Sequence, residues 1–207
     1  PCVDDHPKSS IPPRMKTSKR LLLASGSPRR QELLGQLDVS FAVEAADIDE
    51  TMVSGETPEE HVTRLAREKA LAGLKTSAGA MPSLGSDTIV LLDGNVLGKP
   101  DSPAAAAAML KALSGRTHHV YSAVALALAP DSVMEALNVT AVTFGTMPSA
   151  WIEYYCQSEE AMDKAGAFAI QGVAGHYIRR IEGSYSGFMG LPLYVTAGLL
   201  RRAGLLE

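Results

Sequence analysis

The apolar residues of this chain follow two patterns, short runs typical of β-strands and wider spacings typical of amphipathic helices. The run at residues 84–92 is nearly continuous, as expected for a central strand that is buried on both faces. Asp93-Gly94 directly after it predicts a tight hairpin turn. In total we expect strands at residues 21–24, 40–44, 84–92, 118–129, 134–145, 168–170 and 177–181.

Capping signals mark where the helices should begin. Ser27-Pro28 suits an N-cap followed by a first helical position, and the apolar spacing continues to Leu37. Thr57-Pro58-Glu59-Glu60 has the form of a capping box and should open a long helix. Further helices are expected from Ser102-Pro103 to Ser114-Gly115, at 149–157 and at 193–205. With 207 residues, these elements fit one α/β domain with room for two lobes.

The turn between the first strand and the first helix is a candidate anion site. Ser25, Gly26 and Ser27 are small, so their backbone N–H groups can approach a ligand closely. The helix N-terminus adds free donors and a positive dipole, and Arg29 and Arg30 add forked donors suited to phosphate. Arginines there oppose the dipole, which a bound anion would explain. An ordinary turn with two solvated arginines is the alternative interpretation.

Composition narrows the classes of protein. The net charge of −4 argues against binding to long nucleic acids, so any anion site must be a local cluster of Arg and Lys. Cys2 and Cys156 are too few and too far apart for a disulfide scaffold or a zinc site, which favours a reducing compartment. No apolar stretch reaches membrane-spanning length. We therefore expect a soluble, cytoplasmic protein with no membrane partner.

The first residues differ in composition from the rest. Residues 1–19 contain several prolines and polar or charged residues without any hydrophobic period. We expect a flexible N-terminal extension at 1–19 and a single domain at 20–207.

Two charged residues occupy positions where apolar residues are expected, and a third lies near them. Lys69 continues the helical stripe of Val62 and Ala66, so it requires an anion unless its ammonium extends past the small alanines to water. Asp87 interrupts the buried run, where a carboxylate is costly unless a cation or metal pairs with it. It is either a catalytic group or a structural salt bridge. Lys99, after the hairpin, should return close to Asp87.

The adjacent His118 and His119 lie in one predicted strand. Successive side chains of a strand point to opposite faces, which argues against joint metal binding. We expect both to be structural or surface residues.

A series of short motifs follows in order along the chain. They are Ser25-Gly26-Ser27-Pro28-Arg29-Arg30, Asp47-Ile48-Asp49-Glu50, Leu65-Ala66-Arg67-Glu68-Lys69-Ala70, Ser86-Asp87-Thr88, Gly98-Lys99-Pro100, Leu113-Ser114-Gly115-Arg116-Thr117, Asp163-Lys164-Ala165-Gly166-Ala167 and Gly190-Leu191-Pro192-Leu193. Together they resemble the Maf family of nucleoside triphosphate pyrophosphatases. The similarity is greatest to its dTTP/UTP branch, on Thr88 after the aspartate and on Ile170-Gln171-Gly172.

The resemblance implies a mixed α/β fold related to the inosine triphosphatase family, with a long central sheet and two lobes around a nucleotide cleft. It implies hydrolysis between the α- and β-phosphates of dTTP or UTP, and of modified pyrimidine nucleotides, with Mg²⁺ or Mn²⁺ as cofactor. A homodimer is also implied. On this basis Asp87 accepts the proton of the attacking water, Glu50 orients the metal or the water, and both are metal ligands.

Further residues receive roles from the same resemblance. Lys69 and Lys99, with Arg29 and Arg30, would hold the triphosphate, and Ser25 and Ser27 belong to the same anion turn. Gln171 would read the polar edge of the pyrimidine because it has both a donor and an acceptor, with Thr88 and Arg29 assisting.

Two alternatives stay open from the sequence. One is a non-catalytic nucleotide-binding regulator of cell division, and the other is the same enzyme acting on 7-methyl-GTP or ITP-type substrates. The chain also departs from the family at Gly187, where the loop before Gly190 usually has an asparagine. Walker-type and Gly-x-Gly-x-x-Gly motifs do not occur in the sequence, which excludes those nucleotide-binding loops.

Overall fold

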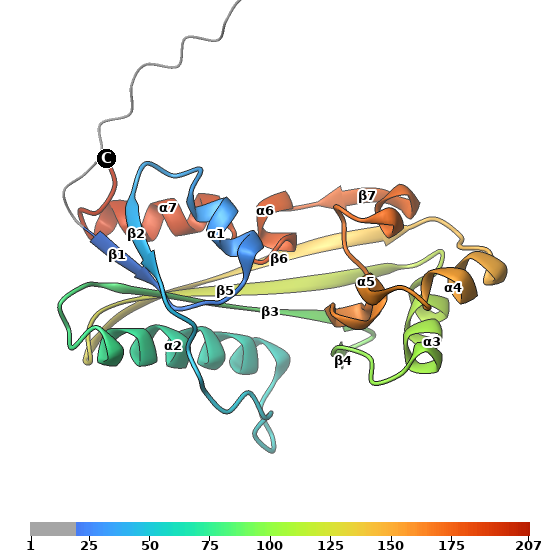
Figure 1. Ribbon diagram of the computed structural model, residues 1–207, viewed down its shortest axis with the longest axis horizontal. Helices are drawn as coiled ribbons and strands as arrows, with labels where there is room; N and C mark the ends of the chain where they lie inside the picture. Colours follow the sequence, from blue (N-terminus) through green and yellow to red (C-terminus); the bar gives the residue numbers. More distant parts are fainter. Residues whose placement is uncertain (1–19) are drawn as a thin grey trace, which may run out of the picture.

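A seven-stranded mixed β-sheet forms the centre of the computed structural model, which describes residues 20–207 (Figure 1). The predicted extension at 1–19 lies outside the described residues. The main strand order is β2-β1-β3-β5-β6-β7, with β4 paired to β3, and only the β2-β1-β3 part is parallel. The strands are β1 (Arg20–Leu23), β2 (Ser40–Val43), β3 (Ser83–Leu92), β4 (Asn95–Leu97), β5 (Thr117–Ala129), β6 (Ser132–Phe144) and β7 (Ile178–Glu182).

Helices cover the sheet in separate groups (Figure 1). The long helix α2 lies along one face, α1 and α7 lie on the other face near β1, and α3, α4 and α5 gather at the far end. The two ends of the sheet thus form two lobes. The helices are α1 (Pro28–Leu34), α2 (Pro58–Thr76), α3 (Pro103–Leu113), α4 (Ser149–Tyr155), α5 (Glu159–Met162), α6 (Tyr185–Phe188) and α7 (Leu193–Arg202), with short 3₁₀ turns η1 (Ala165–Ala167) and η2 (Val173–Tyr177).

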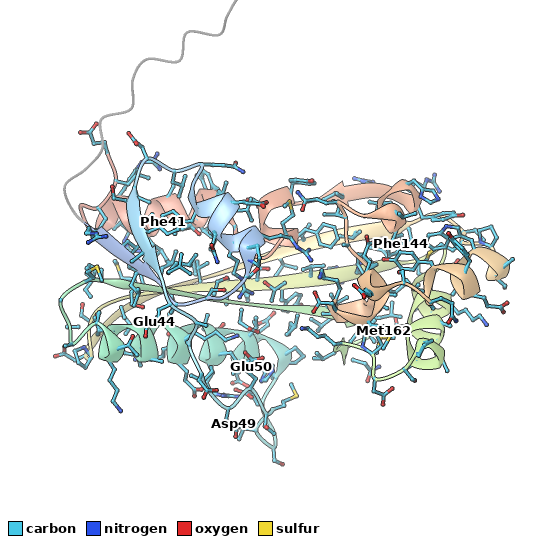
Figure 2. The ribbon with its side chains drawn as sticks, viewed as in Figure 1. Phe41, Glu44, Asp49, Glu50, Phe144 and Met162 are labelled. Carbon is cyan, nitrogen blue, oxygen red and sulfur yellow. The ribbon has the colours of Figure 1, made fainter. Side chains whose placement is uncertain are left out.

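The two-residue period of β5 divides the core between the faces of the sheet. Val124 and Leu126 pack with β1, α1 and α7, whereas the small side chains of Ala123 and Ala125 pack against α2. A third cluster lies in the far lobe, where Phe144 packs beside the helices α3 and α4 (Figure 2).

Gly85 allows α2 to lie very close to β3. A side chain at this position would collide with the helix backbone at Ala66 and Ala70. Residues 85 and 87 point to the same face of the strand. The absent side chain therefore brings the helix close to the carboxylate of Asp87.

Several predicted local structures are confirmed. Thr57 and Glu60 form both hydrogen bonds of the capping box, which begins α2. Asp93 and Gly94 have φ values of 52° and 79°, which join β3 to β4 in a two-residue turn. The long hairpin of β5 and β6 turns at the predicted Pro130-Asp131.

Other predictions were wrong in detail. The first helix ends at Leu34 and is capped at Gly35, so Leu37 packs against the core from outside the helix. Ser27 stands at the N-cap but its side chain makes no capping hydrogen bond.

The predicted strand at 168–170 is also wrong. Beside β6, the place in the sheet is taken by β7. Phe168 instead turns into the far lobe, where its ring packs edge-on against Phe144.

The expectations about cysteines and membrane spans can be compared with the structure within residues 20–207. Cys156 is a free, buried thiol whose pKa is raised by desolvation, as expected for an unreactive cysteine, and Cys2 is outside the described residues. Within residues 20–207, no helix is both long and apolar enough to span a bilayer.

The paired histidines behave as the strand period predicts, since His119 is exposed and His118 is only 1% exposed. The ring of His118 stacks on Phe144, and neither ring nitrogen has a hydrogen-bond partner within the described residues. Desolvation, aided by neighbouring His119, lowers the pKa of His118 to about 4 from an ordinary value of 6.5.

This lowered pKa predicts an acid-sensitive stability. Between pH 6.5 and 4 the unfolded chain binds a proton at His118 that the folded chain does not bind, so the free energy of unfolding should fall as the pH falls. We expect a loss on the order of 3 kcal/mol between pH 7 and 4 in urea denaturation. His118→Phe should remove most of this loss, whereas His119→Phe should retain it. An equal loss in His118→Phe would contradict the explanation.

Candidate active site

A cavity of about 640 Å³ lies between the two lobes. The N-terminus of α1 lines one side of it and η1 lines the other. Most of the predicted site residues line it: Ser27, Arg29, Arg30, Glu50, Lys69, Asp87, Thr88 and Lys99. Ser25 lines an adjacent cavity of about 210 Å³, together with Ser27, Arg30, Glu50 and Lys69. Residues from α1, α2, β3 and three loops thus meet in one place.

The inner part of the cavity contains a three-residue ion cluster of Glu50, Lys69 and Asp87. The Lys69 Nζ atom donates to Asp87 Oδ1 at 2.7 Å and lies 2.6 Å from Glu50 Oε1. Lys69 and Asp87 are each only 7% exposed, whereas Glu50 extends from an exposed loop. The hydrogen bond from Lys69 lowers the pKa of Glu50, so this exposed acid stays a carboxylate beside the ammonium.

Arg30 joins the anion turn to the sheet. Its Nε atom donates to the Gly190 carbonyl at 2.9 Å, and its two Nη atoms donate to Ser25 Oγ at 3.3 Å and Thr88 Oγ1 at 3.4 Å. Desolvation lowers its pKa, partly offset by the charges of Asp87 and Glu50. The guanidinium is therefore held in place by neutral groups and adds positive charge to the cavity.

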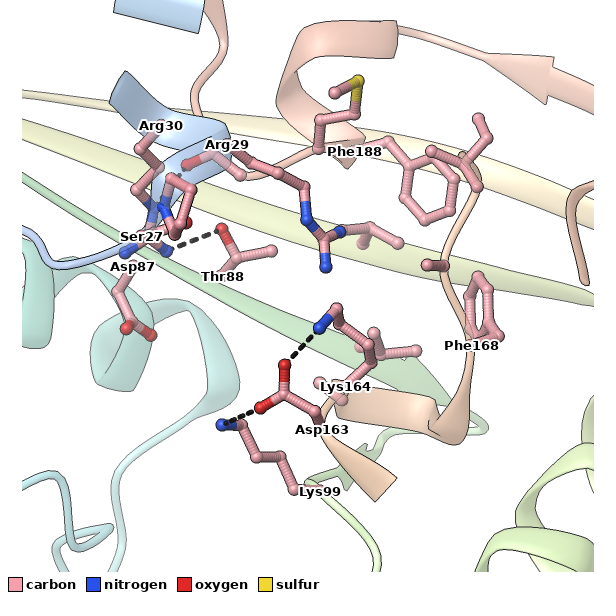
Figure 3. A pocket seen from close by; sticks show the side chains of 18 of the residues that line it. Ser27, Arg29, Arg30, Asp87, Thr88, Lys99, Asp163, Lys164, Phe168 and Phe188 are labelled. Atoms are coloured by element: carbon pink, nitrogen blue, oxygen red, sulfur yellow. Dashed lines mark hydrogen bonds and ion pairs between the residues drawn. The ribbon is translucent and has the colours of Figure 1, made fainter. Parts of the chain in front are cut away.

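The outer part of the cavity carries three further cations around one acid. Figure 3 shows the Asp163 carboxylate between the ammonium groups of Lys99 and Lys164, and the Lys99 contact is 3.2 Å. Lys99 therefore reaches the cavity as predicted but pairs with Asp163 and not with Asp87. Arg29 has no ion pair within residues 20–207. These cations are available to an anionic ligand.

Sequence reasoning assigned no role to Asp163 and Lys164, although both belong to one of the motifs quoted above. The available signal was an acid–base pair next to Gly166, which has a φ of 72° in the turn η1. Their approach to Lys99 depends on the packing of two lobes, which no local pattern shows.

An apolar wall completes the cavity on the side of the far lobe. Phe168 and Phe188 have ring centroids 5.8 Å apart and lie opposite Asp87 (Figure 3). Val90 and Val120 line the cavity beside them. A ligand with a charged part and a flat apolar part would match this division.

Gln171 does not line the main cavity. It is exposed and lines a neighbouring cavity of about 490 Å³, which shares Arg29, Asp163, Lys164 and Ala169 with the main one. Residues 168–170 do not form the predicted strand, and Gln171 follows them in a turn outside the sheet.

Two buried serines attach the loop before α7 to the central strands. Ser86 Oγ donates to the Gly190 carbonyl at 2.9 Å, and Ser122 Oγ donates to the Gly187 carbonyl at 2.7 Å. Ser122 also hydrogen-bonds to Thr88 at 2.9 Å. A side chain on Gly187 would collide with the Asn138 amide, which explains why glycine suits this position here.

The residues that could hold a metal are Glu50 and Asp87. Carboxylates are ligands that Mg²⁺ prefers, and these two lie close together because both contact the Lys69 ammonium. In the described part of the chain, no group of three or more His, Cys, Asp or Glu residues could hold a metal alone. Within residues 20–207 this point thus offers two carboxylates, and a ligand with its own oxygens would have to complete a metal site.

Comparison with known proteins assigns this chain to a family. The family model described as Maf-like protein matches residues 20–203. The chain belongs to the Maf family. This confirms the resemblance inferred from the motifs.

Curated relatives agree with the family model. A protein of Xanthomonas euvesicatoria named dTTP/UTP pyrophosphatase is 51% identical over 187 residues, covering 89% of this chain and 98% of its own length. Proteins with the same name are 51% identical in Escherichia coli K12, covering 87% of this chain and 91% of that protein, and 48% identical in Methylobacillus flagellatus, covering 89% and 93%.

Similarity to solved structures is lower. A nucleoside-triphosphatase described as dITP/XTP pyrophosphatase from Mycobacterium abscessus matches with a TM-score of 0.42 and 19% identity, covering 62% of this chain and 76% of that one. A HAM1 protein from Coxiella burnetii matches with a TM-score of 0.41 and 21% identity, covering 63% and 75%.

The buried ion pair predicts a large difference between two lysines of the cavity. Lys69→Met leaves Asp87 without its cation and should lower the free energy of unfolding by about 3 kcal/mol. Lys99→Met removes a pair whose partners are both about two-thirds exposed, so the change should stay within about 0.5 kcal/mol. Urea denaturation at pH 7 measures both. Equal effects would show that burial of the Lys69–Asp87 pair has no energetic weight.

Proposed function

We propose that this protein is a nucleoside triphosphate pyrophosphatase that hydrolyses dTTP and UTP to the nucleoside monophosphate and pyrophosphate. The observation that carries the proposal is a carboxylate, Asp87, held by the buried Lys69 at the inner end of a cavity whose rim bears Arg29, Lys99 and Lys164. A triphosphate binds where positive charge is concentrated. Because the net charge of this protein is −4, that charge must come from a local cluster such as this one. The names of the relatives at about 50% identity support the substrate class.

The chemistry requires one water and one base. The oxygen of water attacks the α-phosphorus, the bond from that phosphorus to the bridging oxygen of the β-phosphate breaks, and pyrophosphate leaves. Asp87 accepts a proton from the water, and the Lys69 ammonium 2.7 Å away holds this carboxylate in position. Arg29 and Lys99, with Arg30, stabilise the negative charge that develops on the leaving pyrophosphate.

A divalent metal, Mg²⁺ or Mn²⁺, is part of this proposal. Glu50 and Asp87 would hold it together with phosphate oxygens and water, because two carboxylates are a typical protein contribution to a magnesium–nucleotide site. When bound, the metal neutralises phosphate charge and polarises the reacting phosphoryl group. Lys69 contacts both carboxylates and so holds them beside each other.

Selection of the pyrimidine involves Gln171, Thr88 and Arg29. Arg29 lines both the main cavity and the neighbouring cavity of Gln171, so the two cavities adjoin at this residue. The apolar wall of Phe168 and Phe188 gives the base a surface for packing. Ser25 and Ser27 lie at the anion turn and line a small cavity together with Arg30, which donates a hydrogen bond to Ser25.

The remaining parts of the proposal concern the setting. Nucleoside triphosphates are the substrates, modified pyrimidine nucleotides form a second substrate class, and the cytoplasm is where such substrates are found. The family resemblance supports a homodimer, which sedimentation analysis measures directly.

Substrate assays test the activity. We expect pyrophosphate release from dTTP and UTP at rates well above those for CTP, GTP, ITP and 7-methyl-GTP. Asp87→Asn removes the proton acceptor but keeps the shape, so kcat should fall on the order of 10²- to 10⁴-fold. Tight nucleotide binding without turnover would instead indicate the regulator, and preference for 7-methyl-GTP or ITP would contradict the proposed branch.

Metal removal gives a separate prediction. Chelation by EDTA should abolish pyrophosphate release, and added Mg²⁺ or Mn²⁺ should restore it, because without a bound metal the carboxylates of Glu50 and Asp87 repel the triphosphate. In Glu50→Gln, a higher Mg²⁺ concentration should be needed for half-maximal rate. Glu44→Gln, which changes an exposed acid earlier in the same loop, is the control and should behave as the wild type. Full activity in EDTA would contradict the metal assignment.

A further inference from the structure

The loop that carries Glu50 has no helix or strand of its own. Residues 44–57, here called the Glu50 loop, run from β2 to α2, and Figure 2 shows Asp49 and Glu50 on it beside α2. The Glu50 side chain is 60% exposed, and only its carboxylate contacts Lys69. An exposed side chain on an irregular loop needs its backbone to be fixed if its carboxylate is to stay in one position.

Arg64 of α2 provides such an attachment. Its Nη2 atom donates to the Thr51 carbonyl at 3.1 Å, directly after Glu50 in the chain. Its Nε and Nη2 atoms also donate to the two carboxylate oxygens of Glu56 at 2.7 and 3.0 Å. One guanidinium therefore contacts both sides of the loop segment 51–56.

Glu56 connects this guanidinium to the rest of the loop. Its side chain is only 8% exposed, and its Oε2 atom accepts a hydrogen bond from the Val53 backbone N–H at 3.1 Å. His61 Nδ1 lies 3.1 Å from the same oxygen. The hydrogen bonds from Arg64 lower the pKa of Glu56 to about 2, so the carboxylate stays charged at physiological pH.

Helix α2 thus holds the Glu50 loop at two points. Lys69 binds the Glu50 carboxylate, and Arg64, five residues earlier on the same helix, binds the backbone next to it. We propose that Arg64, acting through Glu56 and Thr51, is a positioning residue that holds Glu50 at the catalytic cavity. The catalytic part of this inference rests on the proposed function, whereas the attachment of the loop does not.

A purely structural role for Arg64 is the competing explanation. Arg64 also lies 3.3 Å from Glu68, an i,i+4 pair that would support α2 itself. Arg67 gives a matched control, because it is on the same helix and makes an ion pair with Glu135 of β6 at 3.0 Å, and among the described residues it forms no hydrogen bond or ion pair with the loop. A purely structural role of Arg64 should appear as a change in α2 itself, whereas loss of the loop attachment should change the loop in the Arg64 variant and not in the Arg67 variant.

Hydrogen exchange tests the attachment without any assay of activity. In Arg64→Met, backbone amides of residues 49–56 should exchange at least tenfold faster than in the wild type, and α2 should exchange as before. Arg67→Met should leave the loop unchanged. If Arg64→Met does not fold, Arg64→Lys serves, because one ammonium cannot reproduce the forked contacts to Glu56 and Thr51. Unchanged loop exchange in the Arg64 variant overturns the inference.

A double-mutant cycle tests the consequence for catalysis. Arg64→Met should lower kcat for dTTP on the order of tenfold and change KM less than twofold, because Arg64 does not line the cavity. In a Glu50→Gln background, the same substitution should cause no further loss, since Arg64 acts through Glu50. Equal losses in both backgrounds, or a Glu50→Gln variant with wild-type kcat, overturn the positioning role.

The two experiments separate the possible failures. If the wild type hydrolyses no nucleoside triphosphate, the proposed function is wrong, while the exchange result still decides whether Arg64 holds the loop. If the wild type is active and the cycle is additive, the proposed function stands and the positioning role is wrong.

Discussion

The ion pair between Lys69 and Asp87 is the interaction on which the arrangement of the cavity depends. A carboxylate in a central strand is costly unless a cation reaches it, and here the cation comes from a helix on the face of the sheet. The helix can reach it only because Gly85 leaves room for the α2 backbone. Packing between one helix and one strand thus creates a charged centre inside an apolar core.

A second constraint is the Gly190 carbonyl, which accepts hydrogen bonds from Arg30 and from the buried Ser86. Through this one oxygen, the anion turn, the central strand and the loop before α7 are connected. Arg30 therefore serves the structure as well as the charge of the cavity. Arg29, Lys99 and Lys164 make fewer interactions within the protein. Arg29 has no ion pair in the described chain, and the two lysines share the exposed Asp163.

The cavity joins a rigid inner part to an outer part made of longer side chains. The inner residues stand on α1, α2 and β3, whose packing leaves little freedom. The outer residues come from the segments around Lys99 and η1, at the edge of the far lobe. Glu50 is an exception, because it belongs to the inner ion cluster but stands on an irregular loop. Its position depends on Arg64, which does not touch Glu50 but binds the loop backbone at Thr51.

The amino-acid sequence determined the local elements and the chemistry of most site residues. The capping box at Thr57, the turn at Asp93-Gly94 and the unusual charges at Lys69 and Asp87 depend on neighbours in the chain, so they could be predicted. Only the tertiary structure decided which charges meet. It paired Lys99 with Asp163, placed Gln171 in a neighbouring cavity and left residues 168–170 outside the sheet, where Phe168 packs in the far lobe. Such contacts join residues far apart in sequence, and their geometry follows from how helices and strands pack rather than from any local pattern.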